Sequence, residues 1–251
     1  HLNDPLPVQY GYYLLNILKG DFGPSFKYKD YTVSELIMQG FPVSLELGLL
    51  AILVALLVGV SLGVIAALRQ NSAVDYLVMT LAMTGITIPN FVMAPILILV
   101  VAVFWRLLPA GGWGELKHMV VPVIALSLPQ IAMAARMTRA SLIETLNMPY
   151  IRTAKAKGLP TRLILTRHAA KAALLPVLTW LCPATPAIVT GSVVVEIIFD
   201  LPGIGRHFVK GALNRDYTLV MGVVIFYGFL IIMMNLLVDL LYAWLDPRIR
   251  Y

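Results

Sequence analysis

Long runs of apolar residues dominate the chain after residue 41, and short polar stretches separate them. Each run is long enough, at about 1.5 Å per helical residue, to cross a hydrocarbon core about 30 Å thick, the third only with its flanks. A spanning segment must satisfy its own backbone hydrogen bonds, and strands of a membrane barrel would alternate in polarity, so we expect helices. The predicted helices cover residues 42–68, 77–104, 119–145, 172–196 and 217–240, within a transmembrane domain at 41–245.

Some residues inside these runs affect how the predicted helices bend or pack. The second run holds Pro89, Asn90 and Pro95, so we expect its helix to be kinked or broken, because proline removes a backbone donor and clashes with the preceding turn. The first run contains Gly59-Val-Ser-Leu-Gly63, a GxxxG pattern that allows two helices to approach closely.

The ends of the chain differ from its middle. Residues 1–40 are mixed in polarity and contain no uncharged run that could span a bilayer, so we expect a folded segment outside the hydrocarbon. Five spans place the two ends on opposite sides, with residues 246–251 as a cytoplasmic tail. An external segment of this length needs a translocating element, and we therefore expect a sixth helix upstream of residue 1.

Composition excludes a water-soluble domain. The chain is 59% hydrophobic and 13% charged, with a mean hydropathy of +0.84, whereas soluble domains carry about 25% charged residues. The net charge of +6 does not indicate nucleic acid, because the basic residues gather at the ends of the apolar runs and in one connecting region. That distribution is typical of membrane topology.

The connecting region at 136–171 determines the predicted orientation. This region contains eight basic residues and a single acid, Glu144. Cytoplasmic loops are enriched in lysine and arginine. We therefore expect this region, with a coupling loop at 146–171, and the turn around Arg69 to be cytoplasmic, while 1–40, 107–118 and 200–216 face outward. The basic residues are Arg136, Arg139, Arg152, Lys155, Lys157, Arg162, Arg167 and Lys171.

Motifs for catalysis are absent from the sequence. There is no phosphate-binding G-x-x-x-x-G-K-S/T, no H-E-x-x-H and no G-x-S-x-G. We expect no catalytic residue, no metal and no cofactor in this chain, and any ATP and Mg²⁺ would be bound by another subunit. An intramembrane enzyme would need facing catalytic groups, and the sequence offers no credible set.

Polar groups inside the apolar runs are the candidates for a transport pathway, because ionisable residues are expensive in hydrocarbon. The three acids lie near the ends of their runs, so the alternative is that their side chains reach the membrane interface. The candidates are Glu46, Asn90, Glu196, Asn235 and Asp239.

A short helix is predicted in the cytoplasmic region. Pro149 suits a first helical position, Gly158 suits the residue after the last turn, and Pro160 blocks continuation. A helix this short is unstable alone and must dock. It could lie on the anionic membrane surface, or it could fit a groove on a partner protein, which small residues such as Ala154 and Ala156 would favour.

At this point the sequence resembles a known family. Arg152-Thr-Ala-Lys-Ala-Lys-Gly-Leu159, Arg167-His-Ala169 and Leu174-Leu-Pro-Val-Leu-Thr179 are similar to the peptide and nickel branch of type I ABC-transporter permeases. The general motif of that class has Glu and Ala where this chain has Arg152 and Thr153. The C-terminal Asp246-Pro-Arg-Ile-Arg-Tyr251 fits the same branch, and Gly20-Asp-Phe-Gly-Pro-Ser-Phe-Lys-Tyr-Lys-Asp-Tyr31 resembles its oligopeptide members.

The resemblance implies an all-α membrane protein with the type I permease fold, five helices of which lie in this chain, and a cytoplasmic coupling helix. It implies half of a pathway in a bacterial inner membrane, together with a homologous second permease subunit, two cytoplasmic ATPase subunits, an extracytoplasmic peptide-binding protein and a peptide substrate. The residues implied in ATPase coupling are Tyr150, Arg152, Thr153, Ala154, Lys155, Ala156, Lys157 and Gly158.

Two alternatives stay open on the sequence alone. Within the same class the substrate could be a dipeptide, glutathione or a nickel chelate, although no metal-ligand spacing in the chain argues for nickel. More distantly, an ion-coupled secondary transporter could use Glu46, Glu196 and Asp239 as a relay. Such a transporter would need neither an ATPase nor a docking helix.

Overall fold

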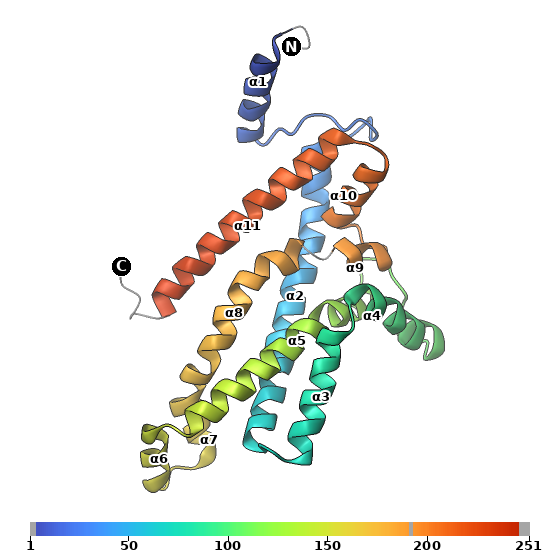
Figure 1. The fold of residues 1–251 in the computed structure, drawn as a ribbon. Helices are drawn as coiled ribbons and strands as arrows, with labels where there is room; N and C mark the ends of the chain where they lie inside the picture. The colour runs from blue at the N-terminus through green and yellow to red at the C-terminus, as the bar shows by residue number, and fades with distance from the viewer. Residues whose placement is uncertain (1–3, 191–192, 246–251) are drawn as a thin grey trace.

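The computed structural model describes residues 4–190 and 193–245, so the predicted tail at 246–251 lies outside the described residues. The described residues are mainly helical, with an isolated antiparallel bridge between Pro24 and Thr32 (Figure 1). The elements are α1 (Leu6–Leu18), α2 (Val33–Leu68), α3 (Ala73–Thr87), α4 (Asn90–Leu97), η1 (Ile98–Phe104), α5 (Leu116–Leu146), α6 (Pro149–Ala156), α7 (Thr161–Leu163), η2 (Ile164–Ala169), α8 (Ala170–Thr190), α9 (Val193–Ile198), α10 (Ile204–Leu213) and α11 (Tyr217–Leu245).

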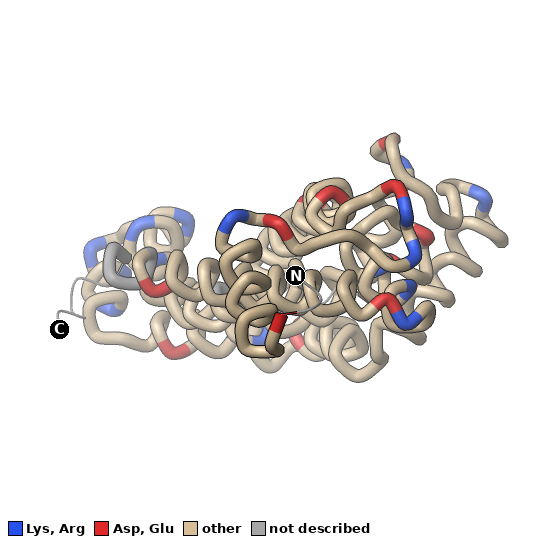
Figure 2. Tube along the Cα trace, turned by 90° about the horizontal axis from the view of Figure 1, so that it is seen from above, with Lys and Arg blue, Asp and Glu red and all other residues tan. Residues whose placement is uncertain are grey.

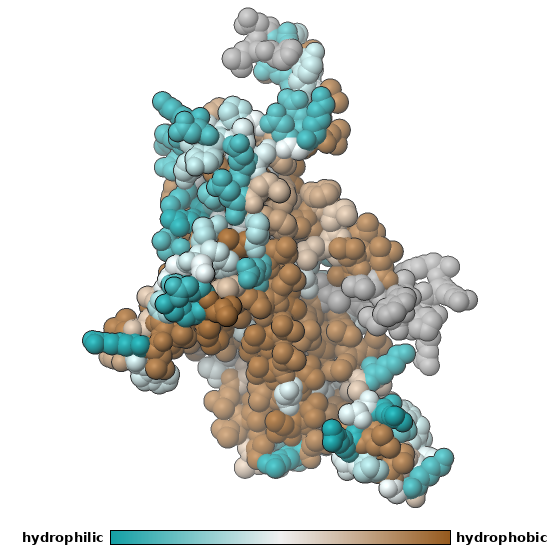
Figure 3. Space-filling view, turned by 180° about the vertical axis from the view of Figure 1, so that it is seen from behind, coloured by the Kyte–Doolittle hydropathy of each residue, from teal (hydrophilic) through white to brown (hydrophobic). Residues whose placement is uncertain are grey.

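The long helices are apolar enough to span a bilayer. Within the described residues, three helices qualify alone: Val33–Leu68, Leu116–Leu146 and Tyr217–Leu240. Two bent pairs qualify together, Ala73–Thr87 with Asn90–Phe104 and Thr161–Leu181 with Pro183–Ile198, so the count is three spans or up to five. Figure 3 shows a broad apolar surface on one face of the molecule, with hydrophilic residues gathered toward its two ends.

Helix α2 begins at Val33, earlier than the predicted residue 42. Thr32 and Glu35 form a capping box, in which the Thr32 side chain accepts from the Glu35 backbone N–H and the Glu35 carboxylate accepts from the Thr32 N–H. Pro42 lies inside the helix. The predicted start of the first helix at residue 42 was therefore wrong, because the last eight residues of 1–40 already belong to α2.

The break expected in the second run is confirmed. Helix α3 ends at Thr87, Pro89 precedes α4, and the two halves of the run meet at 108°. Pro89 cannot donate a backbone hydrogen bond, and the residue before a proline disfavours the helical region, so Ile88 adopts extended angles (φ −93°, ψ 117°).

The GxxxG pattern packs α2 against α5. A Cβ atom on Gly59 would lie 2.7 Å from the Ala134 Cβ, and one on Gly63 would lie 2.6 Å from the Ala135 carbonyl oxygen. The predicted close approach of two helices at these glycines is confirmed, and α5 is the partner. Helix α3 also packs on α5, through Ala82, which lies in a small buried cluster with Ala132 and Ala135 of α5.

Hydrophilic residues gather toward two ends of the molecule (Figure 3), and Figure 1 shows which elements lie at each. One, which we call the α10 end, combines residues 20–32, α9, α10 and the start of α11. The other, the α6 end, combines α6, α7, η2, the α2–α3 turn and the last turns of α5. The predicted external loop at 200–216 contains helix α10, which buries Ile204 and exposes Lys210.

Candidate functional site

Helix α6 is held at both ends by local sequence. Pro149 occupies its first turn, and its last turn closes at Gly158, whose φ of +76° lies in the left-handed region that favours glycine. The Gly158 N–H donates to the Lys155 carbonyl (2.9 Å), and the Leu159 N–H donates to the Ala154 carbonyl (3.3 Å). The second bond is the six-to-one bond typical of a glycine-terminated helix.

The inner face of α6 is anchored to the chain itself. Ile151 has no exposed area and Ala154 is 5% exposed, and both belong to a buried cluster with Leu142 of α5, Ile164 of η2 and other small apolar residues. Ala154 therefore faces inward. The expectation that Ala154 would help α6 approach a partner was wrong, because its methyl group packs inside this chain.

The outer face of α6 is exposed and basic. Tyr150 is 46% exposed, and Gly158 has open space where a Cβ would stand. Its basic residues are Arg152, Lys155 and Lys157, and none of them pairs with a carboxylate among the described residues. Figure 2 shows lysines and arginines gathered where α6 and α7 lie. The other exposed residues of this face are Arg152, Thr153, Lys155, Ala156 and Lys157.

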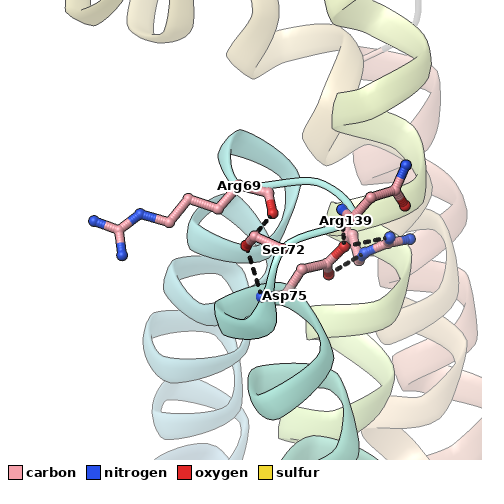
Figure 4. A network of polar contacts seen from close by, with 5 residues as sticks. Arg69, Ser72, Asp75 and Arg139 are labelled. Carbon is pink, nitrogen blue, oxygen red and sulfur yellow. Dashed lines mark hydrogen bonds and ion pairs between the residues drawn. The ribbon is translucent and has the colours of Figure 1, made fainter.

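A buried ion pair joins the α2–α3 turn to α5 (Figure 4). Both carboxylate oxygens of Asp75 accept from the Arg139 guanidinium at 2.6 Å, and one also accepts from the Asn71 N–H at 2.9 Å. Asp75 is 1% exposed. Ser72 caps α3 by accepting from the Asp75 N–H and donates to the Arg69 carbonyl. The bidentate geometry fixes the turn relative to α5.

Glu196 lies inside the protein. It has no exposed area, its Oε1 accepts from the Ser44 hydroxyl (2.7 Å), and its Oε2 accepts from the Gly205 N–H (2.8 Å). Ser44 in turn accepts from the Ile204 N–H (3.0 Å). Glu196 therefore ties α9 to α2 and to the beginning of α10. The alternative that this side chain reaches the membrane interface was wrong, because the carboxylate is buried, and a role of Glu196 in the pathway stays a prediction.

The remaining pathway candidates are dispersed. Glu46 is exposed on α2, and Asn235 and Asp239 are exposed one turn apart on α11. Asn90 opens α4 at the break, and its Oδ1 is enclosed without a hydrogen-bond partner. The structure does not bring these four side chains and Glu196 together into one polar site.

Asp216 organises the α10 end. Its buried carboxylate accepts from the Ser25 hydroxyl, from the backbone N–H groups of Phe26 and Lys27, and from the Leu219 N–H in the first turn of α11. Burial acts to raise the pKa of Asp216, but these hydrogen bonds outweigh it and hold the pKa below its ordinary value. The segment at 22–32 is thereby tied to the start of α11.

The sequence reasoning missed the buried polar partners. Asp75 stands three residues after Ser72, and Asp216 stands directly before an apolar run, so both positions carry helix-cap signals. Those signals locate a helix start, but they do not reveal that Arg139 or Ser25 would be the distant partner.

The chain is similar to known membrane transport proteins. Residues 59–251 match the profile of the family described as binding-protein-dependent transport system inner membrane component. An oligopeptide transport system permease protein of Salmonella typhimurium is 58% identical over all of this chain and 83% of its own length. A dipeptide transport system permease protein of Bacillus subtilis is 49% identical over all of this chain and 81% of its own length.

Solved structures share the fold. A chain of the MetNI methionine ABC transporter in an inward-facing conformation superposes with a TM-score of 0.71 at 16% identity, over 84% of this chain and 97% of that one. A chain of an amino acid ABC transporter crystallised with histidines superposes with a TM-score of 0.67, over 83% of this chain and 93% of that one. At this identity the likeness shows the fold alone.

Proposed function

The chain belongs to the family of binding-protein-dependent transport system inner membrane components, and from that premise we propose that it is the permease subunit of an ATP-driven oligopeptide importer. The choice of oligopeptides as the substrate rests on the 58% identity to an oligopeptide permease over all 251 residues. The relative that transports dipeptides is 49% identical over the full chain, and dipeptides are therefore the second candidate substrate.

In this proposal the five candidate spans cross an inner membrane, and the chain forms half of the translocation pathway. A homologous permease subunit forms the other half, two cytoplasmic ATPase subunits bind and hydrolyse ATP with Mg²⁺, and an extracytoplasmic binding protein delivers the peptide. The basic residues of the α6 end support placing this end, and with it the C-terminus, on the cytoplasmic side. The α10 end then faces the binding protein.

Helix α6 is proposed as the coupling helix. Its inner face, at Ile151 and Ala154, joins it to α5 and η2, so a displacement of α6 moves the ends of two spanning segments. Its outer face offers Tyr150, Arg152 and Lys155 to an acidic groove on an ATPase subunit. The Asp75–Arg139 pair joins the α2–α3 turn to α5, so the turn moves together with this helix.

The test is ATP-dependent uptake of labelled oligopeptides by the complete complex in proteoliposomes, with and without Lys155→Glu. Reversing this charge on the outer face is expected to lower uptake at least tenfold, while Arg69→Glu, an equal charge change at the exposed α2–α3 turn, leaves uptake near normal. Normal uptake by the Lys155 variant would exclude α6 as the coupling surface. Uptake of dipeptides but not of longer peptides would make dipeptides the substrate. Uptake that survives ATP depletion would exclude an ATP-driven importer.

A further inference from the structure

A groove of about 570 Å³ follows the exposed side of α3 and reaches the break before α4. The groove starts beside the α2–α3 turn and follows α3, which together with α4 and η1 forms one of the bent candidate spans. The residues that line it are Tyr76, Met79, Thr80, Met83, Thr84, Thr87 and Ile88.

Three hydroxyl groups run along this groove. Thr80, Thr84 and Thr87 are all exposed and are spaced four and three residues apart, which places them on one face of the helix. The Thr84 hydroxyl donates to the Thr80 carbonyl and the Thr87 hydroxyl donates to the Met83 carbonyl, both at 3.0 Å. Each hydroxyl oxygen keeps acceptor capacity, and a hydroxyl can rotate to donate elsewhere.

Two methionines lie between the hydroxyls. Met79 and Met83 are half-buried in the same groove. Methionine is unbranched and polarisable, so it adapts to side chains of different shape, and binding surfaces that accept many partners use this property. The groove therefore combines hydrogen-bonding groups that suit any peptide backbone with apolar groups that suit many side chains.

The other exposed faces of the spans are different in character. On α11 the exposed side chains include Phe229, Ile232 and Leu236, and on α2 they include Leu53 and Leu57. These faces suit lipid tails. A row of threonines flanked by methionines and a tyrosine does not share that composition.

The groove face of α3 lacks the small residues that would allow another helix to pack closely against it. The small residues of α3, Ala82 and Gly85, already face α5, and a Cβ on Gly85 would lie 2.7 Å from the Leu128 carbonyl oxygen. Helices in membranes approach one another through small residues, and the groove instead carries Tyr76, Met79 and Met83.

We propose that the α3 groove is a peptide-binding wall of the translocation pathway, in which Thr80, Thr84 and Thr87 bind the peptide main chain and Met79 and Met83 accommodate its side chains. Four helical residues rise about 6 Å, close to the about 6.8 Å spanned by two residues of an extended peptide, so Thr80 and Thr84 match alternate peptide units. The groove is open opposite α5, where the homologous permease subunit would supply the other wall. This inference rests on the proposed function.

The first experiment removes the hydroxyls while keeping the side-chain shape. The triple variant Thr80→Val, Thr84→Val, Thr87→Val is assembled with its partner subunits, and uptake of a panel of peptides of equal length is measured. Loss of hydrogen bonds to the main chain is expected to lower uptake at low peptide concentration about tenfold for every sequence. Thr179→Val is the control, because this exposed threonine lies on α8 and its hydroxyl bonds its own helix at Leu175.

The second experiment stiffens the apolar part of the groove. Met79→Ile together with Met83→Ile replaces adaptable side chains by β-branched ones of similar volume. Uptake of peptides with bulky aromatic residues is expected to fall several-fold more than uptake of alanine peptides. Met221→Ile on the exposed face of α11 is the matched control and should not change the ranking.

The outcomes separate this inference from the function it rests on. The proposal is supported if a photoreactive peptide cross-links to residues 76–88 of the wild-type complex and both variants show the expected loss of uptake. Wild-type uptake combined with normal uptake by both variants overturns the groove alone. Loss of the second permease subunit from the threonine variant would make this face a subunit interface and overturn it too. Absence of any peptide uptake by the wild type would overturn the proposed function and the groove with it.

Discussion

The two polar ends of the molecule use their charged residues in opposite ways. At the α10 end, Glu196 and Asp216 have no exposed area and accept hydrogen bonds from segments distant in the chain. At the α6 end, Arg152, Lys155 and Lys157 are exposed, and no described carboxylate pairs with them. The two acids at the α10 end are therefore satisfied inside the chain, whereas the three cations on α6 are exposed.

The difference separates polar groups that stabilise the fold from charges that remain available to a partner. A buried carboxylate that loses its donors destabilises the fold, so substitutions at the α10 end should act on stability. An exposed cation changes stability little, so substitutions on the outer face of α6 should act on assembly and coupling. The Asp75–Arg139 pair is the exception at the α6 end, because its carboxylate is buried and paired.

The largest expected change in stability comes from breaking the Asp75–Arg139 ion pair. Asp75→Ala leaves the Arg139 guanidinium without its bidentate partner and releases the α2–α3 turn, and it should lower the free energy of unfolding by about 3 kcal/mol. Thermal unfolding of the purified subunit measures it. Arg136→Ala, one turn earlier on α5 and exposed, is the control and should change stability little. Equal effects of the two substitutions would remove the distinction between the inner and outer sides of this end.

Glu196→Ala should destabilise the α10 end by about 2 kcal/mol, because the Ser44 hydroxyl and the Gly205 N–H lose their acceptor in a buried site. Glu46→Ala, at an exposed position on α2, should stay within about 0.5 kcal/mol. The comparison is made by unfolding in detergent. If peptide uptake fell while the unfolding midpoint stayed unchanged in the Glu196 variant, the carboxylate would act in the pathway after all.

The pH dependence of the α10 end follows from Asp216. Its pKa is lower in the folded protein than its ordinary value, so its contribution to stability is present above that ordinary value and is lost as the pH falls through the folded pKa. Asp216→Asn should reduce stability at pH 7 by about 1 kcal/mol, since Asn still caps a helix but accepts fewer hydrogen bonds. Measured from pH 7 downward, the difference between wild type and variant should shrink below about pH 4. A difference that stayed constant with pH would contradict this assignment.

The smallest effect concerns the end of α6. Gly158→Ala forces a residue with a Cβ atom into a φ of +76° and should loosen the last turn by about 1 kcal/mol, whereas Gly158→Asn should cost less because asparagine tolerates this region. Hydrogen exchange at residues 149–159 reports the change locally. Gly228→Ala, inside α11 with open space around it, is the control and should not increase exchange. Equal exchange in the alanine and asparagine variants would show that backbone strain is not the cause.

Several features were readable from neighbouring residues in the sequence. The break at Pro89, the close approach at Gly59 and Gly63, and the limits of α6 at Pro149 and Gly158 all depend on the backbone preferences of the residues themselves. The start of α2 was also encoded locally, in Thr32 and Glu35, although Pro42 was the more conspicuous signal.

The buried polar contacts were decided by the tertiary structure. The partners are separated by 64 residues for Asp75 and Arg139, 152 for Ser44 and Glu196, and 191 for Ser25 and Asp216. No periodicity or cap residue specifies such a pair, since its formation depends on how whole helices cross. The same holds for Ala154, whose inward orientation depends on where η2 and α5 lie.

Apolar run lengths, helix breaks and helix caps follow from the sequence because each is a property of a few adjacent residues and of the bilayer that surrounds them. Which carboxylate is buried, which cation is left exposed and which face of α3 forms a groove follow only from the packing of helices. A side chain's environment is the sum of contacts from segments that the linear order keeps apart.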